Sequence, residues 1–302
     1  MRIGIDVGGT KIAAIALGEA GAVLAERRAA TPRDDYEATV GAITGLVHGI
    51  ESELGPGGSV GVGIPGAESL VTGRIKNANS VWLIDRPLAG DLARALDRPV
   101  RLANDANCFA LSEATDGAAA GADVVFGVIL GTGVGGGVVA GGRLLTGVNA
   151  VGGEWGHNPL PWPTDHERPG PPCYCGMQGC IETFLSGPGL ARDYRDDGGE
   201  ALEPAGIAAR AADGDDRAEA AMARYEDRLA RSLATVINLL DPDVIVLGGG
   251  VSNIERLYAG APARWERYVF SDRVDTRLVR ARHGDASGAR GAAWLWPEET
   301  DG

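Results

Sequence analysis

One histidine and three cysteines have a spacing that could hold a metal ion. His157 precedes Cys173, Cys175 and Cys180, and the three cysteines fall within eight residues. An imidazole and three thiolates make a complete tetrahedral set, and a closed four-ligand site is structural rather than catalytic. Such crowding disfavours a disulfide framework, whose bridges usually join distant segments. The spacing therefore predicts a structural zinc ion, against the alternative that the cysteines are small core residues.

Two carboxylates flank this set. Glu154 lies three residues before His157, and Glu182 lies two residues after Cys180. A bound zinc ion would gather both carboxylates into one region, where they could accept hydrogen bonds from the hydroxyls of a sugar. The alternative is that each is an ordinary surface acid.

Asp6 and Lys11 flank a glycine-rich turn near the N-terminus. Asp6 lies in an apolar run, where a carboxylate is costly to bury unless it is paired or holds a cation. If phosphates bind at the turn, Asp6 could hold Mg²⁺ through water; otherwise it is a turn-stabilising group. Lys11 is one of two lysines in the chain, and a solvated surface lysine is the alternative to a phosphate contact.

Glycine-rich turns recur after strand-like segments. They lie at residues 8–11, at 131–137 and at 248–250. Successive backbone N–H groups at glycines form an anion site, and the hydroxyls of Thr10 and Thr132 could add donors. Residues 131–136 also match G-x-G-x-x-G, but no helix can follow this glycine-rich turn, so a Rossmann pyrophosphate site is excluded. The repetition predicts two related halves that each bind phosphate.

Asn104 and Asp105 end a predicted strand, a place where α/β sheets present ligand-binding groups. A carboxylate here could accept the proton of a hydroxyl that attacks a phosphoryl group, in a loose transition state where positioning matters most. The alternative is that Asp105 caps a helix. Cys108 is most simply a small buried residue.

Alternating strands and helices must position these residues. Short apolar runs between turns predict strands at 2–7, 12–17, 60–64, 100–103, 124–130, 138–140 and 243–247, and spacings of three and four predict helices at 36–54, 87–96 and 222–240. Residues 196–216 read as a surface connection. The pattern predicts an α/β fold.

Composition limits the class of protein. The 302 residues are 44% hydrophobic, enough for about two domains, and we place the boundary near 118, giving lobes 1–118 and 119–286. A net charge of −13 argues against nucleic acid as a partner. No apolar run reaches the ~20 residues of a membrane span, and no signal peptide is evident, so we expect a cytoplasmic protein.

Together these motifs resemble the ROK family of sugar kinases, and more particularly its fructokinase branch. The resemblance covers most of the chain and is carried by residues 4–11, 76–80, 102–108, 131–137, 152–159 and 173–182. It implies a two-lobed, actin-like (ribonuclease-H-like) ATPase fold, with a C-terminal helix at about 287–302 packed back on the N-terminal lobe. It also implies ATP with Mg²⁺, one structural zinc, and transfer of the γ-phosphate to the 6-hydroxyl of a hexose. A homodimer is compatible with it.

The resemblance also assigns roles to individual residues. Asp105 corresponds to the catalytic base. The sugar contacts correspond to Asn79, Asn104, Asp105, Glu154, His157 and Glu182, with His157 also a zinc ligand. The ATP regions correspond to Gly4, Ile5, Asp6, Val7, Gly8, Gly9, Thr10 and Lys11; to Gly131, Thr132, Gly133, Val134, Gly135, Gly136, Gly137, Val138, Val139 and Ala140; and, near the adenosine, to Gly248, Gly249 and Gly250.

The sequence leaves open which sugar accepts the phosphate and whether the chain is an enzyme of this family at all. Fructose is favoured by the resemblance, with glucose, mannose and N-acetylhexosamines as competitors. Hydrogen bonds to ring hydroxyls discriminate among these sugars, and the sequence does not give their geometry. A sugar-responsive repressor of the same family is the alternative from another class, but such proteins carry a helix-turn-helix domain ahead of the sugar domain, whereas this acidic chain reaches its expected phosphate-binding hairpin at Ile3. A third alternative, a non-catalytic scaffold, would give the Asp105 carboxylate no role in a reaction.

Overall fold

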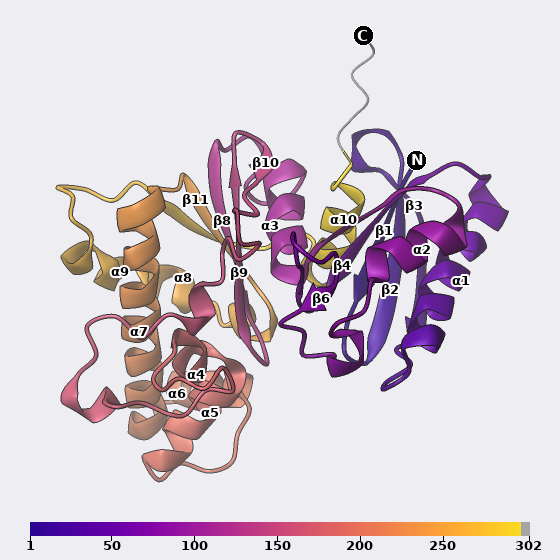
Figure 1. Cartoon of the computed structure of the whole chain (residues 1–302). Helices are drawn as coiled ribbons and strands as arrows, with labels where there is room; N and C mark the ends of the chain where they lie inside the picture. The colour runs from indigo at the N-terminus through magenta and orange to yellow at the C-terminus, as the bar shows by residue number, and fades with distance from the viewer. Residues whose placement is uncertain (297–302) are drawn as a thin grey trace. The chain divides into compact units, whose positions relative to one another are not determined.

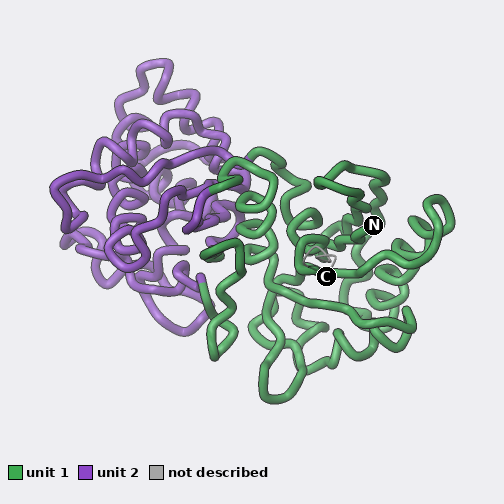
Figure 2. The backbone as a smooth tube through the Cα atoms, turned by 90° about the horizontal axis from the view of Figure 1, so that it is seen from above, with its two compact units in different colours: residues 1–121, 137–152, 282–302 green, residues 122–136, 153–281 purple. Residues whose placement is uncertain are grey.

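The chain folds into two compact units. In the computed structural model, which describes residues 1–296, the first unit comprises 1–121, 137–152 and the described part of 282–302, and the second comprises 122–136 and 153–281 (Figure 2). The boundary predicted near residue 118 stays a prediction. Residues 137–152 group with the first unit because Gly137 packs against Ala106 of that unit, where a Cβ would lie 2.7 Å from the Ala106 carbonyl oxygen.

The first unit is built on a sheet with the strand order β3-β2-β1-β4-β7 (Figure 1). Its strands are β1 (Arg2–Val7), β2 (Lys11–Leu17), β3 (Val23–Ala30), β4 (Ser59–Ile64) and β7 (Val100–Asn104). β1 is antiparallel to β2 and parallel to β4. The predicted strands are confirmed, but β3 escaped prediction because this edge strand is mostly exposed and carries charged residues in place of an apolar run.

Helices of the first unit cover this sheet. They are α1 (Tyr36–Leu54), α2 (Leu88–Leu96), α3 (Asp105–Thr115) and α10 (Ser287–Ala293), and a short hairpin of β5 (Ala67–Glu68) and β6 (Ile75–Lys76) is added. α1 has the predicted bounds. Its residues Ile43, Val47 and Ile50 are fully buried and form the apolar face that the spacing indicated.

Helix α10 packs directly against β1, β4 and α3, although it lies at the other end of the chain (Figure 1). Glycines on both strands permit this approach. A Cβ at Gly4 would lie 1.9 Å from the Ala289 carbonyl oxygen, and one at Gly61 would lie 1.8 Å from that of Ala292. The predicted C-terminal helix is thus present but ends at Ala293, and the predicted extension over 297–302 lies outside the described residues.

The second sheet repeats the strand order of the first, as β10-β9-β8-β11-β12. The strands are β8 (Val124–Leu130), β9 (Val134–Ala140), β10 (Arg143–Leu144), β11 (Val244–Gly248) and β12 (Arg277–Arg280). β11 runs parallel to both β8 and β12. The predicted turn over 131–137 is shorter than expected, because Val134 to Gly137 already belong to β9, and glycine does not prevent extended backbone.

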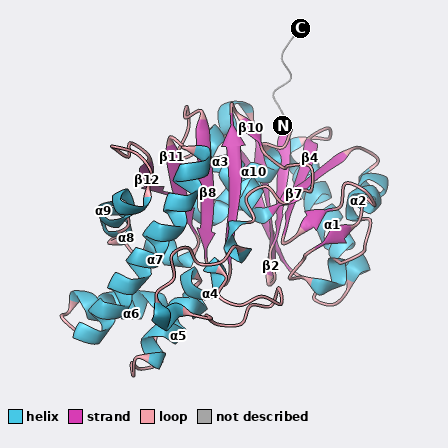
Figure 3. Ribbon diagram, turned by 60° about the vertical axis from the view of Figure 1, so that its left-hand side comes forward, coloured by secondary structure: helices cyan, strands magenta, loops and turns pink. Residues whose placement is uncertain are grey.

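The helices of the second unit gather around α7 (Figure 3). They are α4 (Ile181–Leu185), α5 (Gly187–Asp196), α6 (Pro204–Ala212), α7 (Asp216–Leu240), α8 (Leu257–Gly260) and α9 (Pro262–Trp265). The interpretation of 196–216 as a surface connection was wrong, because α6 lies within it and buries Ile207 and Ala211. Within residues 1–296, none of the helices has the length and apolarity needed to cross a membrane.

Candidate functional site

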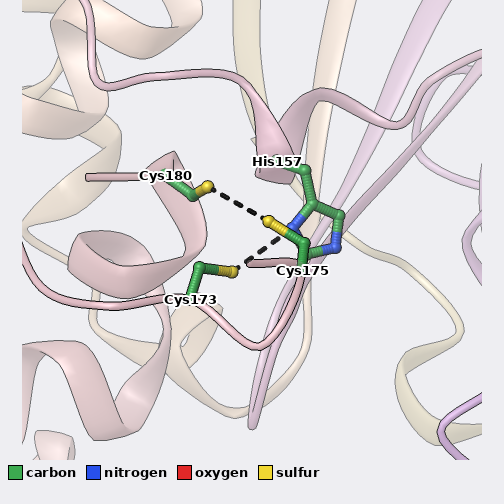
Figure 4. Close-up of side chains that lie close together, drawn as sticks. All are labelled: His157, Cys173, Cys175 and Cys180. Atoms are coloured by element: carbon green, nitrogen blue, oxygen red, sulfur yellow. Dashed lines mark hydrogen bonds between the residues drawn. The ribbon is translucent and has the colours of Figure 1, made fainter. Parts of the chain in front are cut away.

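The predicted metal ligands converge in the second unit. One ligand atom from each of His157, Cys173, Cys175 and Cys180 lies within 4.8 Å of all the others (Figure 4). Cys173 Sγ is 3.5 Å from His157 Nδ1, and Cys175 Sγ is 3.6 Å from Cys180 Sγ. Metal–ligand bonds of about 2.0–2.3 Å give tetrahedral edges of roughly 3.3–3.8 Å. The donor set is compatible with a tetrahedral zinc ion, and these two separations match the edges of its coordination sphere.

Tyr174 contacts the imidazole of this cluster at Nε2, whereas Cys173 faces the other ring nitrogen, Nδ1. Its hydroxyl oxygen is 3.0 Å from His157 Nε2, and the two rings meet edge to face with centroids 5.1 Å apart. Burial, together with the negative charge of Glu182, raises the pKa of Tyr174 to about 12, so the phenol stays protonated at neutral pH. Sequence reasoning missed this residue, and its position between two metal ligands was the available signal.

A buried ion network anchors the chain just before Cys173. Glu167 accepts hydrogen bonds from Arg228 Nε at 2.7 Å and from an Arg231 guanidinium nitrogen at 2.8 Å, and both arginines lie on α7. Burial alone would raise the pKa of Glu167, but these hydrogen bonds and one from the Thr164 N–H lower it to about 2. We call residues 157–180 the metal loop. Helix α7 therefore anchors the middle of this loop through the ion pairs of Arg228 and Arg231 with Glu167.

The two predicted carboxylates lie close to the same cluster. Glu154 directly precedes a 3-10 helix (Trp155–His157), and Glu182 is the second residue of α4, whose N-cap is Cys180. Glu182 accepts a hydrogen bond of 2.9 Å from the Val134 N–H. Both carboxylates act electrostatically on the Tyr174 phenol. The second unit thus brings His157, Glu154 and Glu182 together beside the start of β9.

In the first unit, Asn104 rather than Asp105 caps helix α3. The Asn104 side chain accepts hydrogen bonds from the N–H groups of Ala106 and Asn107, and Asp105 is the first helical residue. Capping by Asp105, the alternative left open above, is therefore wrong: a cap needs extended backbone, which Asn104 has. Asp105 Oδ1 accepts a 2.8 Å bond from the Ala106 N–H, and the carboxylate lies in the positive field of the helix N-terminus.

Asp6 lies near Asp105 in the same unit. Burial, then the negative charge of Asp105, raise the pKa of Asp6 to about 7, and Lys11 opposes this shift. Lys11 Nζ is 3.2 Å from the exposed carboxylate of Asp285. A carboxyl group with so high a pKa is poorly stabilised by its surroundings, and a bound cation would favour its charged form.

The predicted phosphate-binding segments divide into exposed turns and buried strands. Gly9, Thr10 and Lys11 are exposed, whereas Gly4, Ile5 and Val7 are buried in β1. The accessible turn before β9 is formed by Gly131, Thr132 and Gly133. The buried residues of β9 are Val134, Gly136, Gly137, Val138 and Val139. Gly249 and Gly250 are exposed beyond β11, and Asn79 is exposed on the loop after β6.

Comparison with known proteins agrees with this architecture. The profile of the ROK family matches residues 2–299. The N-acetyl-D-glucosamine kinase of Escherichia coli O9:H4 (strain HS) is 42% identical over 299 residues, which cover 98% of this chain and 99% of that protein.

Solved structures show the same fold. The ROK hexokinase of Thermus thermophilus superimposes with a TM-score of 0.85 and 34% identity over 97% of this chain and 96% of that one. The ROK family glucokinase of Streptomyces griseus, solved with glucose and AMPPNP, superimposes with a TM-score of 0.79 and 30% identity, over 97% of this chain and 98% of that one. The α/β, actin-like fold expected from the resemblance is confirmed, and the chain belongs to the ROK family.

Proposed function

We propose that this chain is an ATP-dependent sugar kinase that phosphorylates the 6-hydroxyl of an N-acetylhexosamine, with N-acetylglucosamine as the preferred acceptor. The observation that carries the proposal is the 42% identity to an N-acetyl-D-glucosamine kinase along nearly the whole of both chains. The glucokinase solved with AMPPNP supports ATP as the donor. Fructose, which the resemblance favoured, is not named as the substrate of these relatives and becomes a competitor in the test.

Asp105 is the proposed catalytic base. Its carboxylate lies at the first turn of α3, and the cap formed by Asn104 fixes this turn without using the Asp105 side chain as the cap. A fixed carboxylate could accept the proton of the attacking sugar hydroxyl while that oxygen bonds to the γ-phosphorus and the bond to the β-phosphate oxygen breaks. Because such a transition state is loose, the position of Asp105 matters more than its base strength.

The remaining residues bind and orient the reactants. The proposed sugar contacts are Asn79, Asn104, Glu154, His157 and Glu182, together with Asp105. The exposed and half-buried turn residues would offer backbone N–H groups and threonine hydroxyls to the ATP phosphates; these are Gly8, Gly9, Thr10, Lys11, Gly131, Thr132 and Gly133, with Gly249 and Gly250 proposed near the adenosine.

Two metal ions belong to this proposal. Zinc fits the Cys3His set and would fix the metal loop, and with it the backbone that presents His157 and Glu182. Asp6 would hold Mg²⁺ through water, where the ion would neutralise phosphate charge. The raised pKa of Asp6 fits a side chain that a cation stabilises.

The test is ATP-dependent phosphorylation of N-acetylglucosamine, N-acetylmannosamine, glucose, mannose and fructose with Mg²⁺, measured beside Asp105→Asn. We expect the highest kcat/KM on N-acetylglucosamine and a loss of at least about 100-fold in kcat for the variant, the lower end of what general-base catalysis contributes. Asp34→Asn is the matched control, because Asp34 is exposed in the same unit and has a left-handed φ of 61° that asparagine accepts.

Each outcome has a clear meaning. A higher kcat/KM on fructose or glucose would overturn the acceptor and keep the kinase. No phosphorylation of any sugar by folded protein would overturn the kinase itself. An Asp105→Asn variant as active as Asp34→Asn would remove Asp105 from the mechanism.

A further inference from the structure

Gly288 lies against the carboxylate of Asp6, although the two residues are at opposite ends of the chain. Gly288 is in the first turn of α10, and Asp6 is in β1 of the same unit. A Cβ at Gly288 would lie 2.9 Å from Asp6 Cγ, 2.9 Å from Oδ2 and 3.1 Å from Oδ1. Carbon atoms pack best at about 3.5–4.0 Å, so any side chain at this position would collide with the Asp6 carboxylate.

The backbone of α10 gives no reason for glycine at this position. Gly288 lies within the helix, a conformation that every residue except proline adopts easily, and alanine is the better helix former. The neighbour that requires glycine is therefore the Asp6 side chain. Gly4 differs, because a Cβ there would meet backbone atoms of α10.

The same segment of the chain contacts the glycine-rich turn at a second point. Asp285 lies in a 3-10 helix (Gly284–Ala286) just before α10, and its Oδ2 is 3.2 Å from Lys11 Nζ. Asp6 precedes the turn over residues 8–10, and Lys11 follows it. Residues 285–288 therefore contact the charged side chains on both sides of the turn proposed to bind the ATP phosphates.

We propose that Gly288 is a positioning residue for the reaction: it leaves the space in which the Asp6 carboxylate is held at the place where it meets the Mg²⁺ of ATP. The atoms that an added Cβ would meet are the end of the Asp6 side chain, so this carboxylate would move while α10 stays in place. The inference rests on the proposed function, because it requires ATP with Mg²⁺ as the donor.

Binding of AMPPNP to Gly288→Ala, with Mg²⁺ and with EDTA, tests this role. Calorimetry gives the ratio of the Kd with EDTA to the Kd with Mg²⁺, which reports what Mg²⁺ contributes to binding. We expect this ratio to fall at least about 10-fold from the wild-type value, the lower end of what a hydrogen bond to a charged group contributes. The Kd with EDTA should stay near the wild-type value, because no cation is then present for Asp6 to hold.

The stability of Gly288→Ala should differ from that of Gly4→Ala. The urea midpoint of Gly288→Ala should stay near the wild-type midpoint, because a side chain yields to the new Cβ and alanine favours the helix. Gly4→Ala should unfold at lower urea, because its Cβ meets backbone atoms.

Asp6→Ala, alone and combined with Gly288→Ala, separates positioning from helix packing. If Gly288 acts through Asp6, adding the methyl group to a chain that lacks the carboxylate should leave the Kd ratio unchanged, because the two substitutions are coupled. This comparison also serves if Gly288→Ala folds poorly, since removing the Asp6 carboxylate frees the space that the new Cβ takes.

Gly90→Ala is the matched control. Gly90 lies in α2 of the same unit, and a Cβ there meets nothing within 4 Å. The same substitution in open space should leave both Kd values of AMPPNP unchanged.

The possible failures differ from one another. An unchanged Kd ratio in folded Gly288→Ala overturns the positioning role and keeps the kinase. An equal fall of the ratio in the Asp6→Ala background makes Gly288 a packing residue of α10 and also overturns the role. Equal Kd values with Mg²⁺ and with EDTA in an active wild type overturn it by removing Mg²⁺ from Asp6. A wild-type protein that neither binds AMPPNP nor phosphorylates any sugar overturns the proposed function, and this inference with it.

Discussion

The metal loop and helix α10 are both held firmly, but by opposite means. The metal loop depends on side-chain atoms that are present: the Cys3His set and the Glu167 carboxylate between two arginines of α7. Helix α10 can pack closely on the sheet only because Gly4 and Gly61 have no side chains. A Cβ at either position would fill the space that the α10 backbone occupies. Irregular chain has few ladder hydrogen bonds and needs side-chain anchors, whereas a helix on a sheet needs a close fit.

This difference predicts which kind of substitution each region tolerates. Deleting a polar group should disrupt the metal loop, and adding a methyl group should disrupt the contact of α10. The three predictions that follow test this contrast, beginning with the largest expected effect.

Loss of a metal ligand should have the largest effect. In Cys180→Ser, or after treatment with a strong chelator, we expect bound zinc to fall from about one per chain to near zero. The local unfolding free energy of the metal loop should fall by on the order of 5 kcal/mol or more, since structural zinc in peptides binds with about 10–16 kcal/mol. Zinc analysis and limited proteolysis within 157–180 measure both effects.

Cys108→Ala is the control for this prediction. Cys108 is fully buried in α3 and lies outside the Cys3His set. Zinc content equal to that of the wild type in Cys180→Ser would show that the four residues do not hold the metal together.

Gly4→Ala should have the second-largest effect on stability. Its Cβ would lie 1.9 Å from the Ala289 carbonyl oxygen and 2.5 Å from the Ala293 nitrogen, and both are backbone atoms that cannot swing aside. We expect a loss of about 4 kcal/mol in the free energy of unfolding, above the usual ~1–3 kcal/mol for overpacking because the clash is with backbone atoms, measured by urea denaturation.

Gly45→Ala is the matched control, because a Cβ there meets nothing within 4 Å. Gly45 lies inside α1, where alanine should raise the free energy of unfolding by up to about 1 kcal/mol. Equal stability of Gly4→Ala and wild type would contradict the close fit of α10.

Glu167→Gln should have a smaller effect that depends on pH. At pH 7 we expect a loss of about 3 kcal/mol, because two buried arginines lose their shared carboxylate. The folded pKa of about 2 lies below the ordinary value of 4.5, so the carboxylate stabilises the fold above about pH 4.5, and this contribution is lost as pH falls toward 2. Denaturation of both proteins between pH 7 and 2.5 should show the difference shrinking.

Asp165→Asn serves as the control in the same loop, since that side chain is 99% exposed, against 7% for Glu167. We expect it to change the stability by less than about 0.5 kcal/mol at any of these pH values. A pH-independent difference for Glu167→Gln would show that its charge does not anchor the loop.

Much of the fold could be read from local patterns. The apolar spacing gave the bounds of α1, and the apolar runs located most of the strands that form the two sheets. The exceptions are informative. Strand β3 carries charges on an exposed edge, and α6 lies in an alanine-rich stretch that resembles a connection, so neither presents the pattern of a buried element.

The clustering of the Cys3His set could also be predicted, because its three cysteines are neighbours in the chain. The role of Asn104 as the cap of α3 could not, since Asn104 and Asp105 are both good capping residues and only the backbone conformation selects one. Tyr174 was missed because its position between Cys173 and Cys175 does not show that its hydroxyl reaches His157.

The sequence by itself determined most of the element types, the Cys3His set and the family, because periodicity, ligand spacing and motifs are properties of residues close together in the chain. The tertiary structure alone decided that α10 packs on Gly4 and Gly61, that Asp105 raises the pKa of Asp6, and that Tyr174 contacts His157. These features depend on distances in space. Packing and electrostatic energies change steeply over a few ångströms, and residue spacing along the chain does not fix those distances.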